Sequence, residues 1–218
     1  METADFRKAC LGGDLAGARA GLAAGCDASA ANAKGMTPLM LAVWQQDAVD
    51  LVAALLAAGA DVAAHQPSSG WTAATFAAVG GRTESLRLLL AHGASVVDDW
   101  KALHFAVQYR SRDTVPILLA GGADVNVRDE EGRTALMRAA RNADALLVSL
   151  LLEHRADASR SDADGWGALH FAATRANVPN VKALRAAGAD PDAAAHDGTT
   201  PRGLAEDAGR PKIVAALA

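Results

Sequence analysis

The stretch from Gly35 to Asp61, GMTPLMLAVWQQDAVDLVAALLAAGAD, contains the start and stop signals of two consecutive short helices. Thr37 can cap a helix N-terminus, and Pro38 suits the first helical position because its missing N–H would have no helical partner there. A second apolar segment runs from Val49 to Ala57. Gly59 can end it, because glycine adopts the left-handed conformation at little cost. The stretch therefore predicts two helices joined by a short connection.

Both landmarks of this stretch recur along the chain. Six copies of Gly-Ala-Asp, some degenerate, follow one another at steps of 34, 34, 29, 33 and 33 residues, and Thr-Pro-Leu-Met recurs in parallel. One helix pair cannot bury its apolar face alone, so such pairs must stack on their neighbours. The copies of the first landmark begin at Gly25, Gly59, Gly93, Gly122, Arg155 and Gly188, and those of the second at Thr37, Thr72, Lys101, Thr134, Gly167 and Thr200.

The composition favours helices that pack closely together. Alanine supplies 54 of the 218 residues, whereas aromatic residues supply 4%. Alanine is the best helix former, and its small side chain allows helices to approach in thin layers. The fold class that we expect is an all-α repeat solenoid.

The combined pattern, G-x-T-P-L-x-x-A followed by an LL-containing helix and G-A-D, resembles the ankyrin repeat over essentially the whole chain. The resemblance implies that each repeat has two antiparallel helices and a β-hairpin finger. It also implies a concave face lined by the fingers and the first helices. We expect a single domain, residues 1–218, with about seven repeats including the caps: 1–34, 35–69, 70–98, 99–131, 132–164, 165–197 and 198–218.

Charge and hydropathy narrow the classes of partner. The formal net charge is −4 and the isoelectric point is about 5.8, so no strong basic field exists to hold nucleic acid. No stretch approaches 18 uninterrupted apolar residues, and the start METADFRKACLGGD lacks the apolar segment of a signal peptide. Cys10 and Cys26 do not suggest a disulfide framework. We expect a cytoplasmic protein, and its Ala/Arg/Gly-rich composition is typical of bacteria with GC-rich genomes.

One finger is expected to be short. From Gly93 to Lys101 is 8 residues, whereas the matching step from Gly122 to Thr134 is 12 residues. The finger near Val96–Asp99 should therefore leave a notch in the row of fingers. Two interpretations remain open: neutral drift of a loop, or a site shaped for a protruding element of a partner.

Two other departures from the repeat concern helix ends. Arg155 stands where the other repeats have glycine, and a left-handed conformation there would cost about 1 kcal/mol. Pro116 falls well inside an expected second helix, and proline is tolerated only in the first turn. We therefore expect that helix to begin late, near Asp113, after a longer loop.

The tryptophans and the single tyrosine occupy particular repeat positions. Trp71, Trp100 and Trp166 each stand one residue before the second landmark, while Trp44 and Tyr109 lie at the ends of first helices. The resemblance places both positions on the concave side. Trp and Tyr dominate the energetic hot spots of protein interfaces, so these rings are candidates for contacting a partner. The alternative is that the rings pack on the neighbouring finger.

Acidic residues and arginines also occupy different positions of the repeat. We expect an acidic rim at the fingertips beside an arginine-containing groove, although a solvated surface of mixed sign is the alternative. Mixed signs favour a protein partner over nucleic acid, because clustered acids repel phosphates. The expected rim is Asp98, Asp99, Asp129, Glu130, Glu131, Asp162 and Asp164. The predicted partner-binding residues are Trp44, Trp71, Trp100, Tyr109, Arg110, Arg138, Arg141, Trp166 and Arg175.

The histidines do not indicate a metal or catalytic site. His104 and His170 occupy the fourth position of the second landmark, where the resemblance implies that histidine ties adjacent fingers by hydrogen bonds. No His, Cys and Asp residues have the spacing of metal ligands, and no motif of a nucleophile or phosphate loop is present. We expect no catalytic residue, no metal and no cofactor.

These observations favour a non-enzymatic, monomeric module that binds one partner protein through its concave groove. Two finer versions remain open within that class: an immunity or antitoxin-type inhibitor of a toxic enzyme, and a secreted effector that binds host proteins. Two other classes also remain, namely an enzyme with a small-molecule site near the notch and a protein that self-assembles through its apolar C-terminal edge.

Overall fold

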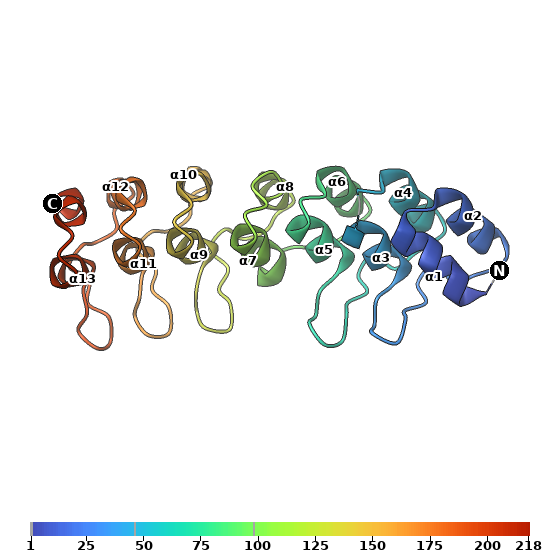
Figure 1. The fold of residues 1–218 in the computed structure, drawn as a ribbon, viewed down its shortest axis with the longest axis horizontal. Coiled ribbons are helices and arrows are strands. Elements are labelled where there is room, and N and C mark those ends of the chain that lie inside the picture. Colours follow the sequence, from blue (N-terminus) through green and yellow to red (C-terminus); the bar gives the residue numbers. More distant parts are fainter. Residues whose placement is uncertain (1, 46, 98) are drawn as a thin grey trace. The chain divides into compact units, whose positions relative to one another are not determined.

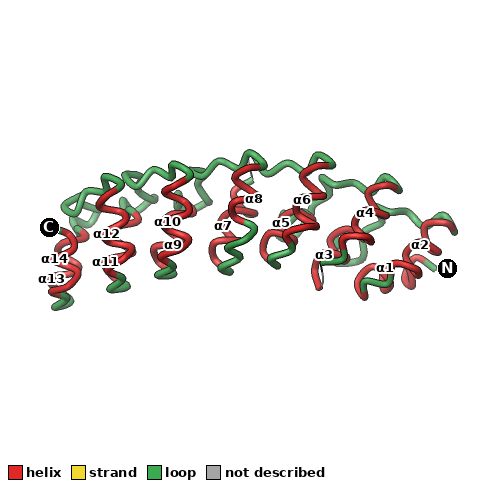
Figure 2. Tube along the Cα trace, turned by 90° about the horizontal axis from the view of Figure 1, so that it is seen from above, coloured by secondary structure: helices red, strands yellow, loops and turns green. Residues whose placement is uncertain are grey.

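The computed structural model describes residues 2–45, 47–97 and 99–218. In these ranges the chain forms fourteen helices in successive pairs and no strand (Figures 1 and 2). The chain divides into two compact units. The N-terminal unit is Met1–Ala106 with Ser111–Gly122, and the C-terminal unit is Val107–Arg110 with Ala123–Ala218.

The helices of the N-terminal unit are α1 (Thr3–Gly12), α2 (Leu15–Ala23), α3 (Pro38–Gln45), α4 (Val49–Ala57), α5 (Ala73–Val79), α6 (Thr83–Ala91), most of α7 (Trp100–Gln108) and α8 (Val115–Ala120). Those of the C-terminal unit are α9 (Ala135–Arg141), α10 (Ala145–Glu153), α11 (Ala168–Thr174), α12 (Val178–Ala186), α13 (Pro201–Asp207) and α14 (Pro211–Leu217).

Threonine caps start the first helix of several pairs, as the sequence predicts. The Thr37 hydroxyl accepts a hydrogen bond from the Met40 N–H at 3.3 Å, and α3 begins at Pro38. Thr72 accepts in the same way from the Thr75 N–H at 3.2 Å. Each cap satisfies one of the backbone donors that a helix N-terminus leaves without an intrahelical partner.

Residues in the left-handed conformation follow many of the helices. Gly59 has φ 81°, and Arg155 at the equivalent position has φ 66°, which confirms that the arginine keeps the conformation of the glycine it replaces. Three further cases were not predicted from the sequence. Arg110, Ala143 and Ala176, each after a first helix, also have positive φ angles.

Each unit consists of two helical layers. In the N-terminal unit α3 packs on α1 and α5, while α4 packs on α2 and α6. In the C-terminal unit α11 packs on α9 and α13, while α12 packs on α10 and α14. Figure 1 shows the first helices of each unit in one layer and the second helices in another.

Leucine and alanine side chains fill the space between these layers. Leu39 and Leu55 are fully buried in the N-terminal unit, as Leu147 and Leu151 are in the C-terminal unit. Ala74 is likewise buried between neighbouring helices, as the alanine-rich composition predicts.

Loops that form the fingers link one helix pair to the next. Two fingers are closed by an isolated antiparallel bridge, His65 with Thr72 and Ser161 with Gly167. The connection between α6 and α7 spans residues 92–99, whereas that between α8 and α9 spans residues 121–134. The prediction of a short finger near Val96–Asp99 is thus confirmed, although Asp98 lies outside the described residues.

The short connection changes how α7 begins. The helix starts at Trp100, and the Asp99 carboxylate accepts a hydrogen bond from the Lys101 N–H at 3.0 Å. Trp100 is therefore the first residue of a helix, while Trp71 and Trp166 each precede a helix cap. The shared position of the three tryptophans in the sequence pattern does not give them the same local structure.

Pro116 delays the start of α8, as expected. The helix begins at Val115 and places the proline in its first turn, after a connection spanning residues 109–114. The corresponding connection between α5 and α6 spans residues 80–82. The predicted start near Asp113 was two residues early, because Thr114 occupies the N-cap position.

Within the described residues, the chain has no helix of the length and apolar character that crossing a bilayer requires.

Candidate binding grooves

Aromatic rings stack on one another beside the fingers of the N-terminal unit. The ring centroid of Trp71 lies 5.1 Å from that of Phe76 and 5.0 Å from that of Phe105. Trp44 meets Phe76 edge-on at 5.3 Å, and Trp100 lies 5.6 Å from Phe105. Such edge and tilted contacts match the quadrupoles of aromatic rings. The candidate residues named from the sequence do not include these phenylalanines, although each lies four residues after the start of the second landmark, which was a usable signal.

Three of these rings line an apolar groove of about 640 Å³ in the N-terminal unit. Trp44 is 50% exposed there, which is uncommon for so large an apolar side chain. We call this hollow the apolar groove. Its lining is Leu11, Asn32, Ala33, Lys34, Met36, Leu41, Trp44, Gln66, Ser69, Trp71 and Phe76.

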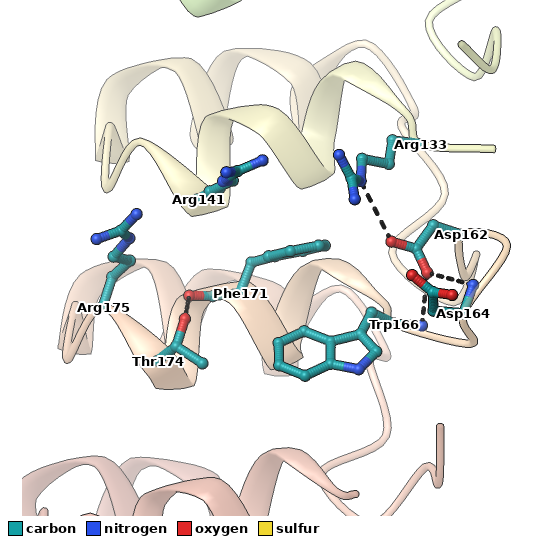
Figure 3. Close-up of a pocket in the computed structure, with 8 residues that line it drawn as sticks. All are labelled: Arg133, Arg141, Asp162, Asp164, Trp166, Phe171, Thr174 and Arg175. Carbon is teal, nitrogen blue, oxygen red and sulfur yellow. Dashed lines mark hydrogen bonds and ion pairs between the residues drawn. The ribbon is translucent and has the colours of Figure 1, made fainter. Parts of the chain in front are cut away.

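The C-terminal unit has a second groove, of about 450 Å³, which we call the arginine groove (Figure 3). Its floor is formed by Trp166 and Phe171, whose ring centroids are 5.4 Å apart. Figure 3 shows Arg141 and Arg175 at one end of the groove and two aspartates at the other. The lining is Arg133, Arg141, Asp162, Asp164, Trp166, Phe171, Thr174 and Arg175.

Some arginines of this region are held by carboxylates of the same unit. The Nε atom of Arg133 lies 3.4 Å from Asp162 Oδ2, and its guanidinium also pairs with Glu131 and lies over the ring of Phe171 at 6.0 Å. Arg138 lies 2.5 Å from Asp129 Oδ2. Arg138 and Arg141 also line a neighbouring cavity of about 400 Å³.

Two of the acidic residues expected at the rim of the fingertips, Asp129 and Asp162, stabilise the finger turns instead. Asp129 is 8% exposed, and its Oδ1 accepts hydrogen bonds from the backbone N–H groups of Glu131 and Arg133. Asp162 is 6% exposed, and its Oδ1 accepts from the N–H groups of Asp164 and Trp166. The prediction of an acidic rim is wrong for Asp129 and Asp162, because the finger turns use their carboxylates to satisfy backbone donors.

His170 links two fingers of the C-terminal unit. Its Nδ1 accepts a hydrogen bond from the Gly167 N–H at 3.0 Å, and its Nε2 donates to the Thr199 carbonyl at 3.2 Å. This pattern requires the neutral ring, and burial holds the pKa of His170 below its ordinary value. The histidine tie implied by the resemblance is therefore confirmed at His170.

The structure sorts the predicted binding residues into groups. Trp44, Trp71 and Trp100 share the aromatic stack of the N-terminal unit. Arg141, Trp166 and Arg175 line the arginine groove, and Arg138 lines the cavity beside it.

Tyr109 and Arg110 belong to neither groove. Tyr109 is 60% exposed at the end of α7. Arg110 donates to the Asn142 carbonyl at 2.8 Å, and its Nε lies 3.9 Å from Asp144 Oδ2. Arg110 therefore contacts the connection between α9 and α10, within the C-terminal unit.

The two grooves occupy equivalent positions of the repeat. In each groove, two consecutive repeats supply the aromatic and wall residues. These residues lie one position before, four positions after and seven positions after the first residue of the second landmark. In the second of these repeats the aromatic pair is kept, as Trp71 and Phe76 in one groove and Trp166 and Phe171 in the other. In the first repeat three apolar residues are replaced by arginines: Met36, Leu41 and Trp44 correspond to Arg133, Arg138 and Arg141.

Comparison with known families agrees with this architecture. The family model for ankyrin repeats (3 copies) matches residues 47–129 and 103–195. The chain belongs to the ankyrin-repeat family.

Individual proteins similar to the chain come from distant organisms. The chain is 38% identical to the nuclear factor NF-kappa-B p105 subunit of Gallus gallus over 164 aligned residues. The aligned segment covers 71% of this chain and 16% of that protein. It is 35% identical to the B-cell lymphoma 3 protein homolog of Mus musculus over 163 aligned residues. That segment covers 71% of this chain and 36% of that protein. A putative ankyrin repeat-containing protein of Treponema pallidum is 36% identical over 129 residues, 57% of this chain and 43% of that protein.

A solved structure extends the similarity to nearly the full chain. The ankyrin repeat domain of Bcl-3, described as a member of the IkappaB protein family, superposes with a TM-score of 0.84 and 29% identity, covering 98% of this chain and 97% of that one. The chain spans less than half of each of the three sequence relatives. Because these relatives come from animals and from a bacterium, the bacterial origin stays a prediction.

Proposed function

We propose that the chain is a non-enzymatic protein-binding module, in which each unit presents a groove to a partner protein. The exposure of Trp44 beside the apolar groove is the observation that carries this proposal. A ring of this size, half exposed next to further apolar surface, gains free energy when a partner removes it from water, by about 25 cal/mol for each Å² buried. Tryptophans in such places are typical interface hot spots.

The surroundings of Trp44 support binding as the role of its ring. The indole rests edge-on against buried Phe76, so its position is fixed before a partner arrives. A preordered anchor reduces the entropy lost on association. Trp71 and Trp100, by contrast, stack on Phe105 and stabilise the fold as well as offering surface.

The partner-binding residues named from the sequence belong to the same proposal, with Tyr109 and Arg110 standing outside the two grooves: Trp44, Trp71, Trp100, Tyr109, Arg110, Arg138, Arg141, Trp166 and Arg175. That the chain acts as a single domain over residues 1–218, as a monomer and in the cytoplasm, belongs to the same proposal. An inhibitor of a toxic enzyme and a secreted effector are two versions of it that differ in whether the partner belongs to the same organism.

The test is affinity capture from a lysate of the source organism, quantified by mass spectrometry, with wild-type protein and with Trp44→Ala. Leu146→Ala is the matched control, because Leu146 is a large apolar residue, 64% exposed on α10 and outside both grooves. We expect a protein captured by the wild type and by the control to be depleted about 30-fold with Trp44→Ala, since hot-spot truncations cost about 2 kcal/mol or more.

Equal capture by Trp44→Ala and the wild type would contradict the proposal. Circular dichroism of all three proteins verifies that the variants remain folded. A partner found only in a lysate of a host organism would select the effector version.

A further inference from the structure

We propose that the arginine groove recognises an acidic side chain of a partner peptide, with a neighbouring apolar side chain of the same peptide packed on Phe171 and Trp166. This inference rests on the proposed protein-binding function and specifies the chemistry of one of its two sites. Its basis is a difference between two grooves that share one backbone plan.

Arginines replace the apolar wall residues at equivalent positions of the two grooves. Met36, Leu41 and Trp44 form the apolar wall of one groove, and the equivalent positions of the other repeat are all arginine. Neighbouring core positions do not change in this way, since Leu39 and Leu136, two residues after the cap, are both buried leucines. The core positions therefore keep one residue type while the wall of the groove changes.

The arginines of this region differ in whether a carboxylate of the chain neutralises them. Arg133 and Arg138 pair with the carboxylates of Asp162 and Asp129. The side chains of Arg141 and Arg175 make no hydrogen bond or ion pair with any residue that the structure describes, and both are exposed. Two guanidinium groups of the groove thus remain available to an external anion.

The two arginines without a partner among the described residues, Arg141 and Arg175, lie close to each other in the groove. Arg141 ends α9 and Arg175 follows α11, and Figure 3 shows the two side chains at the same end of the groove. Two like charges that line one hollow repel each other, although the negative end of each helix dipole offsets part of this cost. A carboxylate or phosphoryl group bound between them would remove the repulsion and accept paired N–H donors from either guanidinium.

The aromatic floor of the groove accounts for the apolar part of the ligand. The rings of Phe171 and Trp166 form the floor between this cationic end and the aspartates, and both are partly exposed. An anion alone would leave these rings in water. An aliphatic or aromatic side chain next to the acidic residue would cover them, as apolar contacts do at the centre of an interface.

The charges at the opposite end exclude a long polyanion as the ligand. Asp164 lines that end of the groove and is exposed, and Glu131 lines the neighbouring cavity. A nucleic-acid backbone would bring successive phosphates towards these carboxylates, in a chain of net charge −4. The groove suits one anionic group on a peptide.

The test is selection from a random peptide display library with the full chain as bait. Three baits are compared: the wild type, Arg141→Gln with Arg175→Gln, and Arg19→Gln with Lys182→Gln. The last pair removes the same charge from exposed residues outside both grooves. We expect the wild type and the control to enrich peptides that carry Asp or Glu beside an apolar residue, and the groove variant to lose this enrichment.

A selected peptide is then synthesised with Glu, Gln or phosphoserine at the acidic position. Replacing Glu by Gln should weaken binding to the wild type about 10-fold or more, since hydrogen bonds to charged groups contribute about 1.5–3 kcal/mol. The same replacement should change binding to the groove variant less than about twofold. Tighter binding of the phosphoserine peptide than of the Glu peptide would identify a phosphoryl group as the preferred anion, within the proposal.

The outcomes separate the two proposals. Selected peptides without acidic residues, or an acidic preference that the groove variant retains, would overturn the inference and leave the protein-binding function standing. If the wild type selects no peptide and captures no protein, both proposals fail.

Discussion

The apolar groove of the N-terminal unit and the arginine groove of the C-terminal unit share one plan and differ in chemistry. Both place a tryptophan and a phenylalanine, 5.1 Å apart in one groove and 5.4 Å apart in the other, in the second of two consecutive repeats. The facing wall is apolar in the first groove and carries arginines in the second. The repeat therefore fixes where a side chain stands, and the residue type at that place sets what the groove can bind.

The difference also separates folding from binding. Leu39 and Leu136 face the core in both units and keep the same residue type, because a change there would open a cavity or bury a charge. Trp44 and Arg141 stand five residues further on, where both are exposed, and there the residue can change without disturbing the stack. Substitutions that copy one groove into the other therefore test whether the two positions differ in their importance for folding.

The largest effect is expected from Arg138→Leu, which copies Leu41 into the C-terminal unit. The change leaves the buried carboxylate of Asp129 without the guanidinium that lies 2.5 Å away. We expect the free energy of unfolding to fall by about 2–3 kcal/mol in urea denaturation.

Arg141→Trp copies Trp44 and is the control for that prediction. Because Arg141 is exposed and its side chain has no partner among the described residues, its replacement should change the free energy of unfolding by less than about 0.5 kcal/mol. Equal effects of the two substitutions would show that the paired and the unpaired arginines do not differ in structural role.

A gain in stability of about 1–2 kcal/mol is expected from Asn180→Leu on α12. The side-chain nitrogen and oxygen of Asn180 are buried without a hydrogen-bond partner in the described structure, which costs free energy. Equivalent polar residues of the N-terminal unit are satisfied, since Thr114 donates to the Ala78 carbonyl at 2.8 Å. The C-terminal repeat before it has Leu147 at this position.

Thermal and urea unfolding of Asn180→Leu check this expectation, and Thr114→Leu is the opposite control, because it removes a satisfied hydrogen bond. Destabilisation by Asn180→Leu would mean that the amide makes a necessary contact.

A smaller gain, about 1 kcal/mol, is expected from Arg155→Gly. Arg155 has φ 66°, in the left-handed region that disfavours residues with a Cβ atom, and Gly59 holds the equivalent place in the N-terminal unit. Gly59→Arg should produce a loss of similar size. If neither substitution shifts the urea midpoint, strain at these helix ends is negligible.

The smallest effect concerns pH and His170, for which the N-terminal unit has Met40, Thr75 and His104 at equivalent positions. Because the pKa of His170 is lowered in the fold, the unfolded chain binds a proton more readily. The stability contributed by the neutral ring is fully present above the ordinary histidine pKa and is lost as pH falls through the lower folded pKa.

Thermal unfolding at about pH 7.5 and about pH 5 tests this sign. The wild type should lose more stability on acidification than His170→Gln. An identical pH dependence of the two proteins would show that His170 does not titrate differently in the fold.

Most of the helical architecture could be predicted from the sequence, because helix starts and ends have local causes. Thr37 and Pro38 mark a helix start, and Gly59 marks an end, through contacts made within a few residues. The start of α7 at Trp100 was missed, because shortening the preceding finger moved the cap to Asp99. That shift depends on the length of a connection rather than on a local motif.

The candidate sites were harder to predict. The positions of Trp44 and Arg141 followed from the repeat, but the burial of Asp129 and Asp162 did not, since acidic residues in loops are usually exposed. The sequence also could not show which arginines are paired. Arg138 and Arg141 look alike in the sequence, yet one lies against Asp129 and the other has its guanidinium open to solvent.

If the two grooves bind a partner protein through different chemistry, variants of the two grooves should differ in the salt dependence of binding. The dissociation constant of the captured partner would be measured over a series of sodium chloride concentrations for the wild type, Trp44→Ala, and Arg141→Gln with Arg175→Gln. The account predicts that Trp44→Ala weakens binding by a similar factor at every salt concentration, whereas the arginine variant weakens it mainly at low salt and flattens the salt dependence. Wild-type affinity in both variants, or the same salt dependence in all three proteins, would contradict it.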